Sequence, residues 1–350
     1  MGANWIKALL CAAAVGPALT GCATADDAAD RAIPVASPVF CTSANSSMNV
    51  VAHEDDDILF MNPPTDTDVA AGRCLTTVYL TAGDDGQSAS YWRGREDGAM
   101  AAYATMAGSP NSWATAKLQT ASGQAAVART LNGTGIRLIF LRLPTGSPSG
   151  RANHHYECLS KLHAGTIRRV HSVDGSAEYT NASLRATLTG FMARFHPSVI
   201  RTLDYTDRYG DGDHADHHNA AYYTEEAQRD YTAPHRLQGF RGYSMTLLPA
   251  NQSDSAAARK LAIFLAYAAH DSHVCQTADA CRHARRYWSW MSRTYEVPAP
   301  FASTVAAAQP AVDGRASRVS ARRLRPEATS RLSTRPQAPV AAHRLDPPSW

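Results

Sequence analysis

Short segments rich in β-branched and apolar residues alternate along this chain with longer segments that are typical of helices. This alternation predicts an α/β fold with a mainly parallel sheet, because parallel neighbours need a crossover connection that is usually a helix. A hairpin is expected where NGTG separates two apolar segments. The expected strands are 48–52, 74–86 (which ends in a glycine-containing loop), 124–131, 136–144 and 199–205, and the expected helices are 92–108, 181–195, 214–231 and 256–270.

The first 22 residues have the layout of a secretory signal peptide, with one lysine, an apolar run and small residues before Cys22. Residues 19–22, LTGC, resemble a bacterial lipobox, in which the cysteine becomes the acylated N-terminus. We therefore expect an exported protein that Cys22 anchors to the cell envelope, and Ala23 is compatible with the outer membrane of a Gram-negative cell. An ordinary cleaved signal peptide and a secreted protein are the alternative.

Residues 298–350 are rich in Pro, Ala, Ser and Arg, and their eight arginines and three acids give a net charge of +5 (8 − 3). The whole chain carries +3, so the remainder is near −2 (3 − 5). The basic balance therefore belongs to this tail, and we expect no nucleic-acid partner for the domain. The tail is expected to be disordered, with an adhesive arm for anionic lipid, peptidoglycan or nucleic acid as the alternative. The expected organisation is a signal peptide (1–22), a linker (23–44), one domain (45–297) and the tail (298–350).

Export would place the domain where disulfides persist. Cys275 and Cys281 flank the short loop QTADA, and we expect them to pair. Cys41 with Cys74 is a further candidate pair, which would leave Cys158 as a buried free thiol. Pairing among these last three cysteines stays open, because connectivity cannot be read from sequence alone.

Two clusters of acids and histidines follow expected strands: 53–57, HEDDD, and 211–218, DGDHADHH. In open parallel sheets, sites form at the carboxyl ends of strands, so both clusters are expected at one edge. Imidazoles and carboxylates are ligands for zinc and similar ions, and His214 and His217 would share one helix face. A solvated loop is the alternative for the first cluster. Its apolar flanks, VVA and ILF, favour burial, which without a cation is costly for four adjacent acids.

Three other kinds of site do not fit the spacing. From Asp207 the third position of an EF-hand loop would be Tyr209, where Asp or Asn is needed. The chain has no H-E-x-x-H segment, and GSPSG at 146–150 has proline where a nucleophile elbow needs serine.

The two clusters together resemble the PIG-L (LmbE-like) family of metal-dependent de-N-acetylases, whose usual motifs are A-H-P-D-D-E and H-x-D-H. Here the motifs read AHEDDD at 52–57 and HADH at 214–217, and the resemblance covers roughly residues 45–295. It implies a Rossmann-like sheet flanked by helices. Glu54 and Asp57 depart from the family pattern, where Pro and Glu are common, but neither position is a metal ligand in the family.

The resemblance implies a role for each matching residue. His53, Asp56 and His217 would bind Zn²⁺ or another divalent transition metal, and Asp55 would be the general base. His214 would stabilise the oxyanion or protonate the leaving amine, Asp216 would orient one of the histidines, and Arg95 would contact the substrate, with a helix-surface charge as its alternative. Asp211 and Asp213 are interpreted as loop residues, as are His154 and His155, and His218 is expected to point away from the site.

The implied activity is removal of an N-acetyl group from an N-acetylglucosamine-like sugar or glycoconjugate. A bound zinc lowers the pKa of its water to about 7 and polarises the amide carbonyl, and an aspartate can take the water's proton. Two alternatives remain open: a non-catalytic carbohydrate-binding envelope lipoprotein on the same fold, and a metal-dependent O-acetyl esterase.

Overall fold

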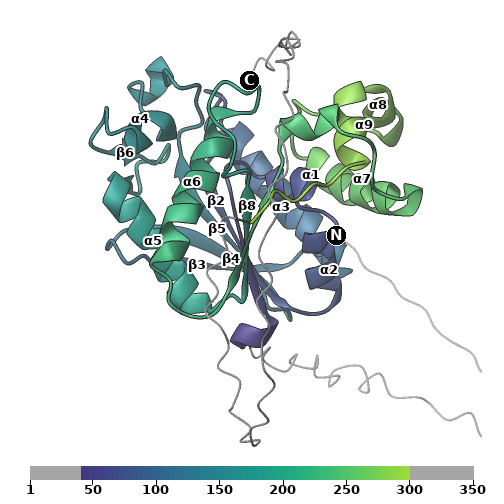
Figure 1. Cartoon of the computed structure of the whole chain (residues 1–350), viewed down its shortest axis with the longest axis horizontal. Coiled ribbons are helices and arrows are strands. Elements are labelled where there is room, and N and C mark those ends of the chain that lie inside the picture. The colour runs from purple at the N-terminus through teal and green to yellow at the C-terminus, as the bar shows by residue number, and fades with distance from the viewer. Residues whose placement is uncertain (1–40, 300–350) are drawn as a thin grey trace, which may run out of the picture. The chain divides into compact units, whose positions relative to one another are not determined.

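A seven-stranded sheet forms the centre of the computed structural model, which describes residues 41–299 (Figure 1). The strand order is β3-β4-β5-β2-β1-β8-β9. Neighbours from β5 to β9 pair in parallel, whereas β3 and β4 run antiparallel at one edge, so the predicted mainly parallel α/β sheet is confirmed. The strands are β1 (Ser46–Val51), β2 (Cys74–Thr81), β3 (Trp113–Gln119), β4 (Ala125–Leu131), β5 (Ile136–Leu143), β8 (Val199–Leu203) and β9 (Arg236–Phe240), and β6 (Val170–His171) with β7 (Glu178–Tyr179) forms a separate two-stranded ribbon.

Helices cover both faces of the sheet (Figure 1). One group packs on the face that includes Val51, and the other on the face that includes Val50, so adjacent residues of β1 belong to opposite cores. All six residues of β1, including the polar Ser46, Ser47 and Asn49, are buried, as expected for a strand that is covered on both sides. The first group includes α1 (Asp56–Phe60), α3 (Ala89–Ala107), α7 (Asp254–Ala268) and α9 (Arg285–Met291), with α2 (Pro64–Ala70) and α8 (Ala278–His283) nearby in the chain; the second includes α4 (Leu159–His163), α5 (Asn181–Phe195) and α6 (Ala215–Arg229).

Local sequence explains where the longest helices begin and end. Helix α3 ends at Ala107 and is followed by Gly108, whose φ of +58° is the left-handed conformation that favours glycine. Helix α5 begins after Thr180, whose hydroxyl accepts a hydrogen bond from the Ser183 amide. Ser253 caps α7 in the same way by accepting from the Ala256 amide. The main helices therefore lie close to the ranges that their sequences predict.

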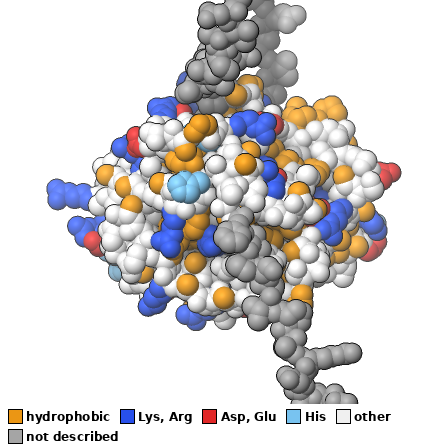
Figure 2. Space-filling model, turned by 90° about the horizontal axis from the view of Figure 1, so that it is seen from below, with side chains coloured by type: hydrophobic (Ala, Val, Ile, Leu, Met, Phe, Trp, Pro, Cys, Tyr) orange, Lys and Arg blue, Asp and Glu red, His pale blue; other side chains and the backbone are white. Residues whose placement is uncertain are grey.

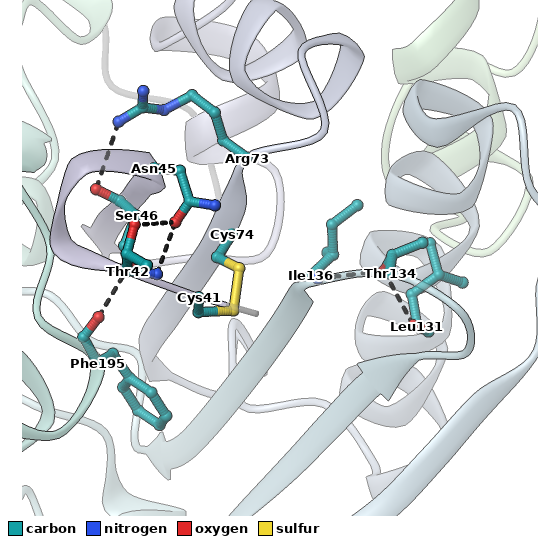
Figure 3. The surroundings of a disulfide bond; sticks show 10 residues. All are labelled: Cys41, Thr42, Asn45, Ser46, Arg73, Cys74, Leu131, Thr134, Ile136 and Phe195. Carbon is teal, nitrogen blue, oxygen red and sulfur yellow. Dashed lines mark hydrogen bonds between the residues drawn. A yellow bond between two sulfur atoms is a disulfide. The ribbon is translucent and has the colours of Figure 1, made fainter. Parts of the chain in front are cut away.

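A disulfide ties the first described residues to the centre of the sheet. Cys41 is bonded to Cys74, the first residue of β2, and a short 3-10 helix, η1 (Ser43–Asn45), connects Cys41 to β1 (Figure 3). Ser46 donates its hydroxyl proton to the Phe195 carbonyl at 2.9 Å, which joins the start of β1 to the end of α5. Residues 41–45 are thus covalently attached to the domain. The predicted signal peptide with Cys22, most of the linker and nearly all of the tail lie outside the described residues.

The other three cysteines in the described residues form one further disulfide and leave one buried thiol. Cys275 is bonded to Cys281, and Cys158 is buried without a disulfide partner among the described residues. Within residues 41–299, no helix has both the length and the apolar character needed to cross a membrane.

The side of the sheet where the parallel strands begin and the side where they end carry different kinds of charged residue. Residues 41–45 lie at the amino ends of the parallel strands, on the lower side in Figure 1. Figure 2 shows this lower face, where Lys and Arg side chains are more numerous than acidic ones. The acidic and histidine clusters follow the carboxyl ends of β1 and β8, at the opposite edge.

Candidate metal centre

Asp56 is the first residue of α1, directly after the turn that leaves β1, and backbone amides of that turn hold its carboxylate. Its Oδ2 accepts hydrogen bonds from the amides of Ala52 (3.1 Å) and His53 (2.7 Å). Its Oδ1 lies 3.0 Å from Nε2 of His217 and 3.4 Å from Nδ1 of His53. The sharp exit from β1 therefore brings one carboxylate oxygen and two imidazole nitrogens together.

His217 projects from the first turn of α6, and its second nitrogen is held by a buried carboxylate. Nδ1 lies 2.7 Å from Oδ1 of Asp213, which also accepts the His214 amide at 2.8 Å. Gly242 lacks the Cβ that would overlap the Asp213 carboxylate, so this position needs glycine. The interpretation of Asp213 as a solvated loop residue is wrong, because its side chain is only 4% exposed and contacts a predicted ligand.

His53 has a comparable second contact. Its Nε2 lies 3.5 Å from Oδ2 of Asp216, which is fully buried and accepts the Gly146 amide at 3.1 Å. Each of the two imidazoles thus has one nitrogen toward Asp56 and the other toward a carboxylate. This arrangement is common for metal-binding histidines, because the outer carboxylate fixes the tautomer and the ring orientation.

The charge balance of this cluster favours a cation. Burial lowers the pKa of His53, but the neighbouring carboxylates of Asp56 and Asp216 outweigh burial and raise this pKa to about 9. Burial likewise opposes charge on Asp56, yet His217 and His53 hold the pKa of that carboxyl well below its usual range. The carboxylates therefore create a negative potential where the imidazole nitrogens converge.

The orphaned nitrogen of His217 tests whether these residues fit a metal ion. Nε2 is buried and lies 3.0 Å from Oδ1 of Asp56, but no group among the described residues is placed to form a hydrogen bond with it, while Nδ1 is committed to Asp213. A buried nitrogen lone pair facing a carboxylate is suited to a divalent transition metal. Donor atoms of His53, His214 and His217 also lie within 4.8 Å of one another, so a third imidazole borders the same point.

His214 is oriented differently from the other two imidazoles. It is the N-cap of α6, and its Nδ1 accepts the Asp216 amide at 3.1 Å. Burial, together with the neighbouring His53 and His217, holds the pKa of His214 well below its usual range. The ring is therefore neutral with its proton on Nε2, which makes that nitrogen a hydrogen-bond donor.

Asp55 lies beside Asp56 and is paired with a buried arginine. Arg95 donates from Nη2 to Oδ1 of Asp55 at 2.7 Å and from Nη1 to the Gly83 carbonyl at 2.7 Å. Its Nε donates to the Tyr267 hydroxyl at 2.6 Å. Burial raises the pKa of Asp55 although Arg95 acts in the opposite direction. Arg95 is 8% exposed, so the helix-surface alternative is wrong, and its direct partner in the structure is the predicted base.

The remaining acids of the 53–57 run are buried, and each has its own environment. Asp57 accepts hydrogen bonds from the hydroxyls of Tyr103 and Tyr79, and burial raises its pKa to about 7. Glu54 is fully buried within 3.5 Å of Arg95, and burial raises its pKa to about 8. The solvated-loop alternative for this run is therefore wrong.

Some polar contacts near this edge have no clear signal in the sequence. His154, interpreted as a loop residue, places Nε2 2.7 Å from Oδ2 of Asp84 in the loop after β2. The Thr145 amide also donates to Asp84, which fixes the 144–156 segment against that loop. His218 contacts Asp211 at 3.0 Å and is not among the convergent imidazoles. Only the density of acids and histidines in DGDHADHH could have indicated that Asp213 belongs to the site.

Comparison with known proteins identifies the family. The family model described as PIG-L: GlcNAc-PI de-N-acetylase matches residues 48–228, which is more than half of the chain. None of the curated proteins matches the chain.

Solved structures with similarity to the chain come from several proteins. N,N'-diacetylchitobiose deacetylase from Pyrococcus horikoshii is 10% identical, with a TM-score of 0.41 and coverage of 70% of this chain and 75% of that one. A zinc-inhibited form of teicoplanin deacetylase is 11% identical, with a TM-score of 0.40 and coverage of 69% and 90%. The 4-carboxy-2-hydroxymuconate hydratase of Pseudomonas putida is 15% identical, with a TM-score of 0.37 and coverage of 70% and 83%. With the family model matched across both sequence motifs, the chain belongs to the PIG-L (GlcNAc-PI de-N-acetylase) family.

Proposed function

We propose that this protein is a metal-dependent hydrolase that removes the acetyl group from an N-acetylglucosamine-like sugar or glycoconjugate. The observation that carries the proposal is the convergence of Asp56 Oδ1 with His217 Nε2 at 3.0 Å and His53 Nδ1 at 3.4 Å, next to an arginine-held Asp55. The family description, which names a de-N-acetylase, supports the reaction type.

His53, Asp56 and His217 would hold the metal, and Zn²⁺ suits this set of nitrogen and oxygen donors. When bound, a divalent cation of this kind lowers the pKa of a water ligand and polarises a carbonyl oxygen. Asp213 and Asp216 would keep the two imidazoles in the tautomers that leave one nitrogen of each free.

Asp55 would accept the proton of the attacking water. Its carboxylate is within hydrogen-bond distance of Arg95, which leaves one oxygen held and the other available. Because Arg95 is itself bound to the Gly83 carbonyl and the Tyr267 hydroxyl, it fixes the orientation of Asp55. Substrate contact by Arg95, which the family resemblance implies, stays a prediction.

His214 would donate its Nε2 proton to the oxyanion that forms at the acetyl carbonyl. Its Nδ1 already accepts a hydrogen bond from a backbone amide, and its low pKa keeps the ring neutral, so this role suits it better than protonation of the leaving amine. Loss of one such donor typically lowers kcat about 10²–10³-fold. Asp55 would return to the amine the proton that it takes from the water.

The decisive experiment combines metal analysis with acetate release. Purified protein should hold about one equivalent of divalent metal and release acetate from N-acetylglucosamine-containing sugars. Asp55→Asn should keep the metal and lose most of the activity, whereas His53→Ala should lose both. Turnover by Asp55→Asn close to that of the wild type would refute the general-base role.

The same assay separates the other candidate activities. Acetate released only from O-acetylated sugars would identify an esterase. Sugar binding without bound metal and without acetate release would identify a carbohydrate-binding protein.

We also propose that the protein is exported and anchored to the cell envelope through Cys22, with secretion as the alternative. The two disulfides support export, because disulfides persist mainly in oxidising compartments. Labelling with a radioactive fatty acid in a host that makes lipoproteins tests this proposal. Wild-type protein should be labelled and Cys22→Ser should not, and an unlabelled wild type would favour simple secretion.

A further inference from the structure

A shallow hollow of about 360 Å³ lies beside the start of α3, outside the group of convergent imidazoles. Its wall comes from the first turn of α3 and from the turn that follows α7. The lining residues are Ser90, Tyr91, Ala269, His270, Ser272 and Gln276. None is a carboxylate, lysine or arginine, so the lining offers hydroxyl, amide and imidazole groups together with one aromatic ring. These groups suit a neutral ligand rich in hydroxyl and amide groups.

The hollow is connected to Asp55 through a short series of side chains. The Tyr91 hydroxyl donates to Oδ1 of Asp271 at 3.2 Å, and Oδ2 of Asp271 lies 3.2 Å from Nε of Arg95. Arg95 in turn donates to Asp55. Tyr91 and Arg95 are four residues apart on the same face of α3, which corresponds to about 6 Å along the helix axis. The hollow is therefore linked to the candidate centre through the buried side chains of Asp271 and Arg95.

The wall of the hollow is fixed before any ligand arrives. The ring of Tyr91 lies 4.5 Å from that of His273, and the Asp271 contact sets the orientation of its hydroxyl. Gln276 donates to the Asp271 carbonyl at 2.6 Å within the turn, and the Cys275–Cys281 disulfide closes the turn covalently. A preformed aromatic wall with polar neighbours reduces the ordering cost of binding.

We propose that this hollow binds the sugar unit adjacent to the one that is deacetylated, so that the substrate is an oligosaccharide rather than a single amino sugar. The inference rests on the proposed function, because it identifies the neighbour of an N-acetylated unit placed at Asp55. Tyr91 would contact one face of the second ring, and the serine, histidine and glutamine side chains would contact its hydroxyl and acetamido groups.

The test compares N-acetylglucosamine with N,N'-diacetylchitobiose. For metal-loaded wild-type protein, kcat/KM for the disaccharide should exceed that for the monosaccharide by about tenfold, as expected from one aromatic contact and one or two hydrogen bonds. Ser272→Trp, which fills the hollow, should bring this ratio close to one. Ala186→Trp, on an exposed position of α5 across the sheet, is the matched control and should leave the ratio unchanged (Figure 1).

Binding to metal-free protein gives a second readout that does not depend on turnover. Isothermal titration should show tighter binding of the disaccharide than of the monosaccharide, and Ser272→Trp or Ser90→Trp should abolish the difference. Ser90→Trp fills the hollow from α3 and covers the case in which the first variant does not fold. Equal wild-type affinities for the two sugars, or no effect of either variant, would overturn the subsite.

The two proposals fail in different ways. If the wild type releases acetate from both sugars with equal kcat/KM, the proposed function stands and the subsite is refuted. If it releases no acetate but binds the disaccharide in a manner sensitive to Ser272→Trp, the hollow is a sugar site and the proposed function is refuted.

Discussion

His217 shows how one residue depends on a neighbour that the family motifs do not contain. Nδ1 of His217 is 2.7 Å from Oδ1 of Asp213, and Nε2 is 3.0 Å from Oδ1 of Asp56, so a carboxylate at each nitrogen holds the orientation of the ring. Although burial opposes it, Asp56 and Asp213 raise the pKa of His217 well above its usual range. The same two carboxylates would favour a metal ion at Nε2, because both stabilise positive charge at or near this imidazole.

The first prediction concerns Asp213→Asn. The amide keeps the size of the side chain but removes the negative charge at Nδ1 of His217, so metal affinity should fall about 10–100-fold. Competition with a chelator followed by metal analysis measures this. Asp211→Asn is the control in the same loop. Asp211 Oδ1 contacts His218 and accepts the Asp213 amide, and an asparagine oxygen can accept the same amide, so this variant should retain wild-type affinity. Equal affinities in the two variants would contradict the role of Asp213.

Lys260 is a buried amine far along the chain from the metal cluster. Its Nζ donates to the carbonyls of Trp290 (2.7 Å) and Arg293 (2.9 Å), and burial lowers its pKa to about 7. In the unfolded chain the pKa returns to about 10.4. Between these two values the unfolded state binds one more proton than the folded state, so this lysine makes stability rise as the pH rises.

The second prediction follows from that sign. Between pH 7.5 and 9.5, the free energy of unfolding of the wild type should rise relative to Lys260→Met by up to about 1.4 kcal/mol per pH unit. Urea unfolding at several pH values measures the two slopes. Lys117→Met, at an exposed position of β3, should keep the wild-type slope. Identical slopes for wild type and Lys260→Met would show that the amine does not titrate in this range.

At the scale of elements, sequence pattern was sufficient where periodicity and caps act locally. β1, β2, the β4–β5 hairpin and helices α3, α5, α6 and α7 all lie near their predicted ranges. β9 was missed because RLQGF is short and follows a proline. β3 was missed because WATAKLQ is an edge strand with mostly exposed residues. The strand identity of these segments depends on pairing with distant partners, which local pattern does not contain.

The candidate site shows the same limit. The motifs predicted which residues of 53–57 and 214–217 come together, because both follow parallel strands that end at one edge. They could not predict that Arg95 faces Asp55, since that contact depends on Tyr267 and Asp271, more than 170 residues away in sequence. Asp213 was missed because the segment that packs against its carboxylate, at Gly242 and Tyr243, is about 30 residues away in sequence.

The close packing of α3 against α7 leads to the third prediction. A Cβ added at Gly98 would lie 2.8 Å from the Tyr267 carbonyl oxygen, which belongs to backbone and cannot turn away. Gly98→Ala should therefore lower the free energy of unfolding by about 1–3 kcal/mol, and thermal unfolding measures it.

Gly190→Ala is the matched control for this substitution. Its added Cβ would lie 2.9 Å from the Cβ of Ala121, in a turn at the surface, and 3.8 Å from the nearest backbone atom of that residue. The turn must shift to make room, so stability should fall, but by less than in Gly98→Ala. A larger loss of stability in Gly190→Ala than in Gly98→Ala would contradict the interpretation.

For the molecule as a whole, the two disulfides constrain very different lengths of chain. Cys41 and Cys74 are 33 residues apart, whereas Cys275 and Cys281 are six apart. In the chain-entropy model the longer loop stabilises more, by about 3–4 kcal/mol against about 2 kcal/mol. The first disulfide therefore stabilises the whole fold, and the second mainly a local turn.

The fourth prediction compares their removal. The double variant Cys41→Ser/Cys74→Ser should lose more free energy of unfolding than Cys275→Ser/Cys281→Ser, as measured by denaturant unfolding under oxidising conditions. The second variant should instead reduce the kcat/KM preference for the disaccharide, because its turn forms one wall of the hollow. A greater stability loss from the short loop would contradict this assignment.

The Cys41–Cys74 bond also determines how the domain would carry a mechanical load. Tension applied to the chain before residue 41 divides at Cys41 between the disulfide, which leads into β2, and the backbone of η1, which leads into β1 (Figure 3). Both strands have a parallel neighbour on each side. Force along a strand shears the hydrogen bonds on both of its sides at once, instead of peeling an edge strand away one bond at a time. A domain tethered through its N-terminal segment would thus be pulled at two interior strands, from the side opposite to the candidate metal centre.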